Sequence, residues 1–299
     1  MSADIDAVLA RLPQLAGVPR RITPLAGGLS NHSFKVTTPS LTAVVRLPAG
    51  DAGLLGVDRE AEYRNTVAAH AAGIGPAVLD RLPDAGVLVL GWLEGRTLTP
   101  ADLGVPAVLD RVVAACRILH VGAQFTGDVD LMASHRRYRG ICAEHGFTLP
   151  PGYDDHQGTV ELIAGVLAAG TEGVSPCHND LVAANILDSG DRVSFVDYEY
   201  SGNADPCFEL GNLAESAGLP AEEVVDRYYG RSRPSRSARA RLYGILAAHT
   251  WVLWAAIRAG TGDPPDGLGD WAAEQYARAA SALTSPRLPG VITAATARD

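Results

Sequence analysis

The spacing of apolar residues changes once along the chain, near Gly95, and this change restricts the folds that the chain can adopt. Before Gly95, short runs such as residues 42–47 are rich in β-branched side chains, which favours strands joined by tight turns. After Gly95, runs such as residues 107–120 carry apolar side chains at helical spacing. We therefore predict an α+β protein of two lobes: a small antiparallel sheet lobe in residues 1–94 and a larger, mainly helical lobe in residues 95–299.

The first lobe is also predicted to contain one helix, at residues 57–72, which has acidic side chains in its first turn. Two further strand-like runs follow at residues 77–82 and 87–92. In the second lobe, residues 231–239 and 260–270 are rich in charge, proline or glycine and lack an apolar period, so they predict surface loops.

The composition excludes several classes of partner. The 299 residues carry 25 basic and 34 acidic side chains, a net charge of −9, which argues against nucleic-acid binding and against a polybasic membrane anchor. No apolar run approaches the roughly 18 residues of a membrane span, and the first residues are acidic where a signal peptide would be basic. We expect a soluble, cytoplasmic protein with reduced cysteines and no stable membrane association, and we leave homodimer formation open.

Three polar side chains recur at the ends of apolar runs between residues 178 and 199. Asp180 and Asn185 lie five positions apart in HNDLVAAN, and Asp197 follows the strand-like run VSFV. Phosphoryl transfer needs a carboxylate that accepts the proton of the attacking hydroxyl, and an amide and a second carboxylate that hold magnesium. These three residues supply that set, whereas His178 is interpreted as a packing residue of the loop.

The run HNDLVAAN, followed by VDYEYSG and ELGN, resembles the choline/ethanolamine kinase family within the aminoglycoside phosphotransferase-like kinases. The resemblance covers most of the chain and implies the two-lobed protein-kinase-like fold, with ATP and Mg²⁺ as cofactors. It further implies that Asp180 is the catalytic base, that Asn185 and Asp197 bind magnesium, and that Glu199 belongs to the same site. Glu209 stands where the family often has aspartate, and is expected to anchor the catalytic loop.

The first lobe carries matching nucleotide-binding features. The run GGLSNHSFKV resembles the family's phosphate-covering turn, which makes Gly28, Ser30 and Asn31 candidate nucleotide ligands. Arg46 stands in the strand where protein kinases have a lysine, as it does in choline-kinase-like proteins, and its guanidinium can bind phosphate oxygens in a bidentate manner. The resemblance implies that Glu62 is the acidic partner of Arg46, and the alternative is a solvated surface glutamate.

The adenine ring is expected against the segment that connects the lobes, VLVLGWLEG, where Leu90 and Trp92 would form part of an apolar wall.

The acceptor site is predicted in the helical lobe. Trp251 and Trp254 lie three residues apart, hence on one helical face, and tryptophan faces bind quaternary ammonium groups. The segment resembles the WxxW helix of choline kinases, and by the same resemblance Trp271, Tyr276 and Glu215 are added as candidate acceptor-binding residues. Core packing is the alternative for the tryptophan pair.

We therefore expect an ATP- and Mg²⁺-dependent kinase for choline or a related amino alcohol such as ethanolamine, with a small cationic alcohol as its substrate. One alternative is a kinase of the same fold that acts on an aminoglycoside, thiamine or a sugar. The other is a nucleotide-binding pseudokinase scaffold, suggested by Arg46 in the lysine position and opposed by the intact Asp180, Asn185 and Asp197.

Overall fold

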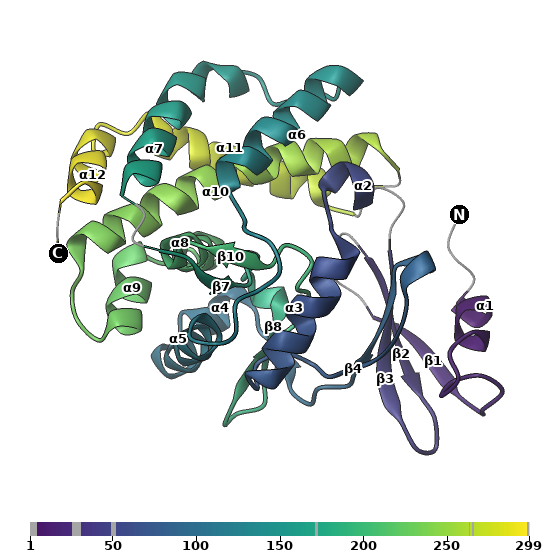
Figure 1. Ribbon diagram of the computed structural model, residues 1–299. Helices are drawn as coiled ribbons and strands as arrows, with labels where there is room; N and C mark the ends of the chain where they lie inside the picture. The colour runs from purple at the N-terminus through teal and green to yellow at the C-terminus, as the bar shows by residue number, and fades with distance from the viewer. Residues whose placement is uncertain are drawn as a thin grey trace.

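The computed structural model describes residues 5–25, 31–48, 52–170, 173–262, 264, 266–297 and 299. A five-stranded sheet forms the smaller lobe, and helices surround two short sheets in the larger lobe (Figure 1). The predicted α+β architecture of two lobes is confirmed.

The smaller lobe is built on a fully antiparallel sheet with the strand order β1-β2-β3-β5-β4. Alternate side chains of its central strand are buried, as a strand with one face on a core requires. The bounds are β1 Arg21–Leu25, β2 Asn31–Thr37, β3 Thr42–Pro48, β4 Val78–Leu82 and β5 Val87–Gly91, with helices α1 Ile5–Ala10, α2 Ala52–Leu55 and α3 Arg59–Ala71 and the 3-10 turn η1 Pro83–Ala85.

Helix α3 connects the two lobes. Asp58 caps its first turn, since the Asp58 carboxylate accepts hydrogen bonds from the backbone N–H groups of Glu60 and Ala61, each at 3.0 Å. Toward its C-terminal end, Ala69 belongs to the hydrophobic core of the larger lobe, and Ile74 just beyond the helix belongs to the same core. The helix therefore fixes the sheet against the larger lobe.

The larger lobe is mainly helical. Its elements are β6 Arg96–Thr97, α4 Pro100–Leu103, α5 Pro106–His120, α6 Leu131–His145, η2 Tyr153–His156, α7 Gln157–Ala169, β7 Ser175–Cys177, η3 Ala183–Asn185, β8 Ile186–Asp188, β9 Val193–Phe195, β10 Gly202–Ala204, α8 Pro206–Ala217, α9 Ala221–Tyr229, α10 Pro234–Gly260, α11 Leu268–Leu283 and α12 Leu288–Ala295. The sheet of the smaller lobe ends at Gly91, and β6 already pairs with β8 of the larger lobe. We propose a lobe boundary at residues 94–95.

The prediction of a surface loop at residues 231–239 is wrong. Helix α10 begins at Pro234, and Arg239 is buried within it. The Arg239 guanidinium forms an ion pair of 2.6 Å with Asp205, which precedes α8. The charge of Arg239, which the sequence analysis predicted to be exposed to solvent, is thus neutralised inside the protein. The second predicted loop is shorter than expected, because α11 begins at Leu268.

Helix α10 is long and apolar enough to span a membrane, which the sequence prediction did not anticipate. However, 78% of its most apolar stretch is buried inside the protein, as in the core helix of a soluble protein. It packs against α6, α8, α9, α11 and α12 and forms the central axis of the larger lobe (Figure 1).

Helices α8 and α10 approach each other with backbone against backbone. A Cβ atom at Gly244 would lie 2.8 Å from the carbonyl oxygen of Gly211, and one at Gly211 would collide with the carbonyl oxygen of Ala240. Only glycine at both positions permits this distance between the helix axes.

Candidate active site

The loop between β7 and β8 holds the predicted catalytic pair. The amide nitrogen of Asn185 donates hydrogen bonds to the backbone oxygen of Asp180 at 2.9 Å and to its Oδ2 at 3.0 Å. These bonds orient the Asp180 carboxylate. Because Nδ2 of Asn185 is used in this way, Asn185 would bind a cation through Oδ1.

The neighbour of the predicted catalytic residue and a predicted metal-binding residue both have a left-handed backbone. Of the residues that the structure describes, only Asn179 and Asp197 have a positive φ without being glycine, at 65° and 72°. Such conformations cost energy and persist where surrounding contacts fix them, commonly at functional sites. The side chain of Asn179 donates to the backbone oxygen of Tyr200 at 3.2 Å, which joins the loop to the segment after Asp197.

Glu209, in the first turn of α8, holds the predicted catalytic loop in place. Its carboxylate accepts hydrogen bonds from the backbone N–H of His178 and, at 2.9 Å, from that of Asn179. His120 on α5 lies 2.7 Å from the other carboxylate oxygen. Although complete burial alone would raise the pKa of Glu209, His120, His178 and the backbone donor of Asn179 outweigh burial and lower it. Glu209 is therefore a buried anion that holds the loop, as the sequence predicted.

His178 itself packs inside the loop. Its Nε2 lies 2.9 Å from the backbone oxygen of Val196, and its ring contacts those of Phe195 and Tyr198. Burial lowers the pKa of His178, so the neutral ring is favoured. These contacts agree with a packing residue.

Arg46 on β3 connects the lobes through carboxylates. Its guanidinium lies 2.8 Å from Glu62 on α3 and 2.7 Å from Asp197, with Glu199 at 3.8 Å. The expected pair of Arg46 with Glu62 is present, and Glu62 is buried rather than a solvated surface residue. Burial opposes the charged form of Arg46, but Asp197, Glu62 and Glu199 outweigh burial and raise its pKa.

A second guanidinium, that of Arg59, joins this network although the sequence analysis did not select it. Its Nη1 lies 2.7 Å from Glu62 and 3.4 Å from Glu199. Asn31 also donates to Glu199, at 2.8 Å. The position of Arg59, three residues before Glu62 on the same helix, was a usable signal, since side chains at i and i+3 are neighbours.

The charge around Asp180 is predominantly negative. Burial raises the pKa of Asp180, and the nearby carboxylates of Asp197 and Glu199 raise it further, while the hydrogen bond from Asn185 acts in the opposite direction. A bound divalent cation would relieve this repulsion. The carboxylate and amide oxygens of Asp197 and Asn185 are the hard ligands that Mg²⁺ prefers, and 26% of the Asp197 side chain is exposed.

The remaining predicted nucleotide-binding residues lie along the small sheet. Gly28 and Ser30 lie outside the described residues, and Asn31 begins β2. Leu90 is buried within β5, and Trp92 follows that strand directly. The ammonium group of Lys35 lies 3.5 Å from the centre of a ring of Trp92, a cation–π contact that orients this indole.

A cavity of about 450 Å³ lies beside the catalytic loop. Asn179 and Glu199 line it next to the predicted catalytic and metal residues, and four carboxylates line it in all: Asp58, Asp128, Asp130 and Glu199. Its aromatic lining residues are Tyr138, Tyr200, Phe208 and Trp251. This combination of acidic and aromatic groups suits a cationic ligand.

Of the aromatic residues predicted to form an acceptor cage, only Trp251 lines this cavity. Trp254 is 5% exposed and donates from Nε1 to the Tyr200 hydroxyl at 2.7 Å, with the ring of Trp271 at 6.2 Å. Tyr276 donates to the backbone oxygen of Pro151 at 3.0 Å. Trp254 and, through it, Trp271 therefore support Tyr200, while Tyr276 belongs to the same apolar cluster. The cage itself stays a prediction.

The predicted acceptor residue Glu215, on α8, lies 3.2 Å from Arg278 on α11. Burial raises its pKa, and Arg278 acts in the opposite direction. Glu215 is not among the residues that line the cavity beside the catalytic loop.

Two tyrosines that line the cavity, Tyr138 and Tyr200, were missed by sequence analysis. Tyr200 directly follows Glu199 in DYEY, so its position next to a predicted site residue was a signal. Tyr138 lies on α6 and donates to the backbone oxygen of Leu55 at 2.8 Å. No local pattern announces it, because it reaches the site only through the packing of α6 against α2.

This fold and this catalytic loop define a two-lobed phosphotransferase of the protein-kinase-like class. A family model described as choline/ethanolamine kinase matches residues 22–229, and the chain belongs to that family. It is 30% identical to a choline/ethanolamine kinase family protein from Mesorhizobium loti, whose crystal structure superposes with a TM-score of 0.84 over 98% of both chains.

Two curated relatives match more distantly. Protein LicA of Haemophilus influenzae is 26% identical over 266 residues, which cover 82% of this chain and 75% of that protein. Ethanolamine kinase 2 of Mus musculus is 28% identical over 243 residues, which cover 70% of this chain and 62% of that protein.

Proposed function

We propose that the protein is an ATP- and Mg²⁺-dependent kinase that transfers the γ-phosphoryl group of ATP to the hydroxyl of choline or ethanolamine. One observation carries the proposal. The Asp180 carboxylate accepts a hydrogen bond from Asn185 and lies near the carboxylates of Asp197 and Glu199, beside a cavity that acidic and aromatic residues line. Membership of the choline/ethanolamine kinase family supports it. The substrate is then a small cationic alcohol in the cytoplasm rather than a nucleic acid.

Asp180 acts as the general base. It orients the acceptor hydroxyl and takes its proton as the hydroxyl oxygen bonds to the γ-phosphorus, while the bond from that phosphorus to the β–γ bridging oxygen breaks and ADP leaves. The raised pKa of Asp180 suits a proton acceptor. Asn185 and Asp197 would hold Mg²⁺, which when bound neutralises charge on the nucleotide phosphates, and Glu199 belongs to the same site.

Arg46 adds a cationic contact to the phosphates from the smaller lobe. Its guanidinium is already held by Glu62 and Asp197, so its position needs little reorganisation when the nucleotide binds. Asn31, Leu90 and Trp92 complete the proposed nucleotide site on the same lobe.

The acceptor ammonium binds in the cavity beside Tyr200 and Trp251. The residues that line the cavity include four carboxylates and one arginine, Arg137. This excess of negative charge favours a cation over a neutral sugar. Trp251 also donates from Nε1 to Asn212 at 3.4 Å, and Asn212 donates to the backbone oxygen of Asn179 at 3.4 Å. Acceptor binding is thereby linked to the catalytic loop.

The test is Mg²⁺-dependent ADP release from purified protein with choline, ethanolamine, thiamine, an aminoglycoside and a sugar, against a blank without acceptor. Turnover with choline or ethanolamine alone supports the proposal. Turnover only with another acceptor would reassign the substrate and keep the phosphotransferase. Nucleotide binding without turnover on any acceptor would favour the pseudokinase.

The assignment of the base has its own variant. Asp180→Asn should lower kcat by about 10²–10⁴-fold and leave ATP binding within a few-fold, because the amide keeps the shape of the side chain and cannot accept the proton. Asp191→Asn, in the exposed turn between β8 and β9, is the matched control and should retain full activity. Full activity of Asp180→Asn would refute the role.

A further inference from the structure

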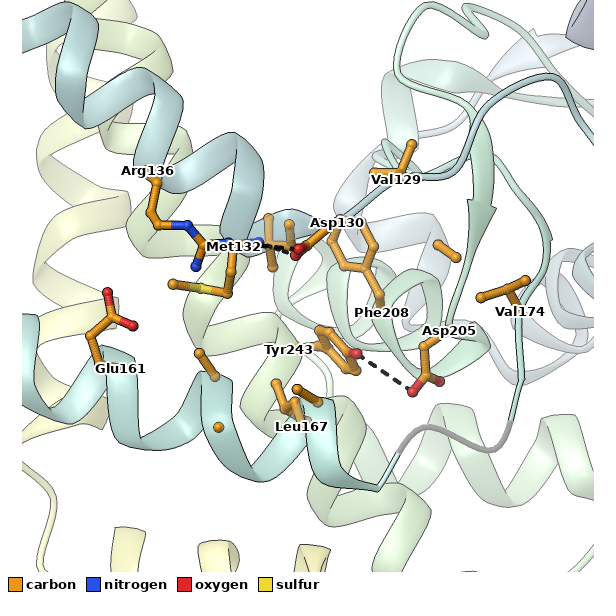
Figure 2. Close-up of a pocket in the computed structure, with 15 residues that line it drawn as sticks. Val129, Asp130, Met132, Arg136, Glu161, Leu167, Val174, Asp205, Phe208 and Tyr243 are labelled. Carbon is orange, nitrogen blue, oxygen red and sulfur yellow. Dashed lines mark hydrogen bonds and ion pairs between the residues drawn. The ribbon is translucent and has the colours of Figure 1, made fainter.

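A second cavity, of about 530 Å³, opens on the other side of the segment that precedes α6. Its walls come from α6, α7, the start of α8 and Tyr243 on α10 (Figure 2). It shares Val129, Asp130, Leu131 and Phe208 with the cavity beside the catalytic loop, and none of the predicted catalytic or metal-binding residues line it. The shared residues form a partition between the two spaces.

The centre of this second cavity is apolar and aromatic. The rings of Phe208 and Tyr243 lie 5.7 Å apart at an angle of 36°, and the side chains of Met132 and Leu167 lie around them (Figure 2). Methionine adapts its shape to aromatic ligands, and tilted aromatic pairs present a face to bound groups. These residues can hold a bulky apolar or aromatic body.

Part of the α7 wall of the cavity, beside Glu161 and Leu167, lacks large side chains. Ala164, Gly165 and Ala168 line it from α7, and a Cβ atom at Gly165 would meet no atom within 4 Å. Glycine inside a helix costs about 1 kcal/mol relative to alanine. At this position it leaves space that a larger residue could fill.

The charges of the lining are mainly negative. Asp130, Glu161 and Asp205 supply three carboxylates, and Arg136 is the one basic residue among those that line the cavity. Asp205 is neutralised by Arg239 at 2.6 Å, and Arg136 lies 3.8 Å from Asp130. Glu161, which accepts a hydrogen bond from Gln157 at 2.8 Å, remains without a basic partner among the lining residues. The α7 side of the cavity, where the exposed Glu161 lies, therefore favours a cation.

We propose that this cavity is a second ligand site, which binds an organic ammonium compound with an aromatic or bulky apolar body. The ammonium group lies near Glu161, and the body lies against Phe208, Tyr243 and Met132. The volume is in the range of about 300–1,000 Å³ that small-molecule sites occupy. The site is separate from the phosphoryl-transfer site and does not depend on the acceptor of that reaction.

The test uses three probes with one indole body and different charge: tryptamine as the cation, tryptophol as the neutral form and indole-3-acetate as the anion. Binding to the full chain is measured by titration calorimetry without nucleotide. Tryptamine should bind at least about threefold more tightly than tryptophol and more tightly still than indole-3-acetate. Equal binding of the three probes, or no binding of tryptamine at about 10 mM, would overturn the proposal.

Two variants place the probe. Gly165→Leu fills the open wall and should weaken tryptamine binding at least about tenfold, whereas Gly158→Leu, the same change at an exposed position of α7 outside the cavity, should leave it within about twofold. Glu161→Gln should weaken the binding of tryptamine and leave the binding of tryptophol unchanged. This variant tests the site if Gly165→Leu fails to fold. Tryptamine binding that neither Gly165→Leu nor Glu161→Gln alters would place the probe elsewhere, such as the acceptor cavity, and would refute the site.

Discussion

Removal of the Glu209 carboxylate should detach the catalytic loop from α8. Glu209→Ala would leave three buried donors without their acceptor: the backbone N–H groups of His178 and Asn179 and the ring of His120. Each unsatisfied buried donor costs about 1–3 kcal/mol, and removing one partner of a buried ionic network costs about 3–5 kcal/mol. We expect the free energy of unfolding to fall by about 3–5 kcal/mol.

Glu209→Gln should be much milder, because the network can adapt to an amide. The amide oxygen can keep the bonds from His178 and Asn179, and the amide nitrogen can donate to Nε2 of a neutral His120 whose Nδ1 faces the Tyr228 hydroxyl at 2.8 Å. What is lost is the charge assistance of these bonds, about 1–2 kcal/mol.

The assay is urea unfolding followed by tryptophan fluorescence, together with kcat for ADP release. The expected order of stability is parent, Glu209→Gln, Glu209→Ala, with kcat falling in the same order because Asp180 follows Asn179 directly. Glu222→Ala, at an exposed glutamate of α9, is the control and should stay within about 0.5 kcal/mol of the parent. The reasoning is refuted if Glu209→Ala loses less than about 1 kcal/mol.

Three further predictions concern other parts of the molecule. Burial, helped by His135 and His156, lowers the pKa of His249 to about 3. Below about pH 6.5 the unfolded chain therefore takes up a proton that the folded protein does not. The free energy of unfolding should fall as the pH drops below 6.5, by up to 1.36 kcal/mol per pH unit from this group. His249→Phe should remove that slope in urea titrations at several pH values, and an unchanged slope would contradict it. Gly211→Ala should destabilise by about 1–3 kcal/mol or more in the same assay, because its Cβ would collide with Ala240, and a neutral result would mean that α8 and α10 can separate. Trp251→Leu should raise the KM for choline by about 2–30-fold with little change in kcat, whereas Trp254→Phe should chiefly lower the melting temperature; the reverse pattern would put the acceptor against Trp254.

The sequence alone predicted those parts of the fold that have a local signature. The strands around Arg46 alternate, and the helix that carries Glu62 begins at an aspartate cap, so both elements could be placed from neighbouring residues. The loop reading of residues 231–239 failed because the burial of Arg239 depends on Asp205, a partner 34 positions away in the chain. A charged side chain in a sequence is therefore predicted to be exposed unless its partner elsewhere in the chain is known.

The residues of the candidate site also fall into two groups: those that local sequence could predict and those that only the packing of the chain reveals. Asp180 and Asn185 lie on one loop, and their spacing in the sequence is enough to bring them together. The aromatic lining needed three dimensions: Trp251 and Trp254 share a helix, yet only packing decides that the first lines a cavity and the second supports Tyr200. Tyr138 reaches the same cavity from α6 without any pattern that marks it.

The contact of α8 with α10 limits how the specificity of this enzyme can change. Helix α8 carries Glu209 in its first turn, and α10 carries Trp251, which lines the proposed acceptor cavity. The two helices meet at Gly211 and Gly244 with backbone against backbone. No residue there can be enlarged or trimmed to move the acceptor relative to Asp180. Variants that accept longer or bulkier alcohols should therefore arise at Tyr138 and Tyr200, which line the same cavity from α6 and from the segment after Glu199, while the distance from ammonium to hydroxyl stays constant.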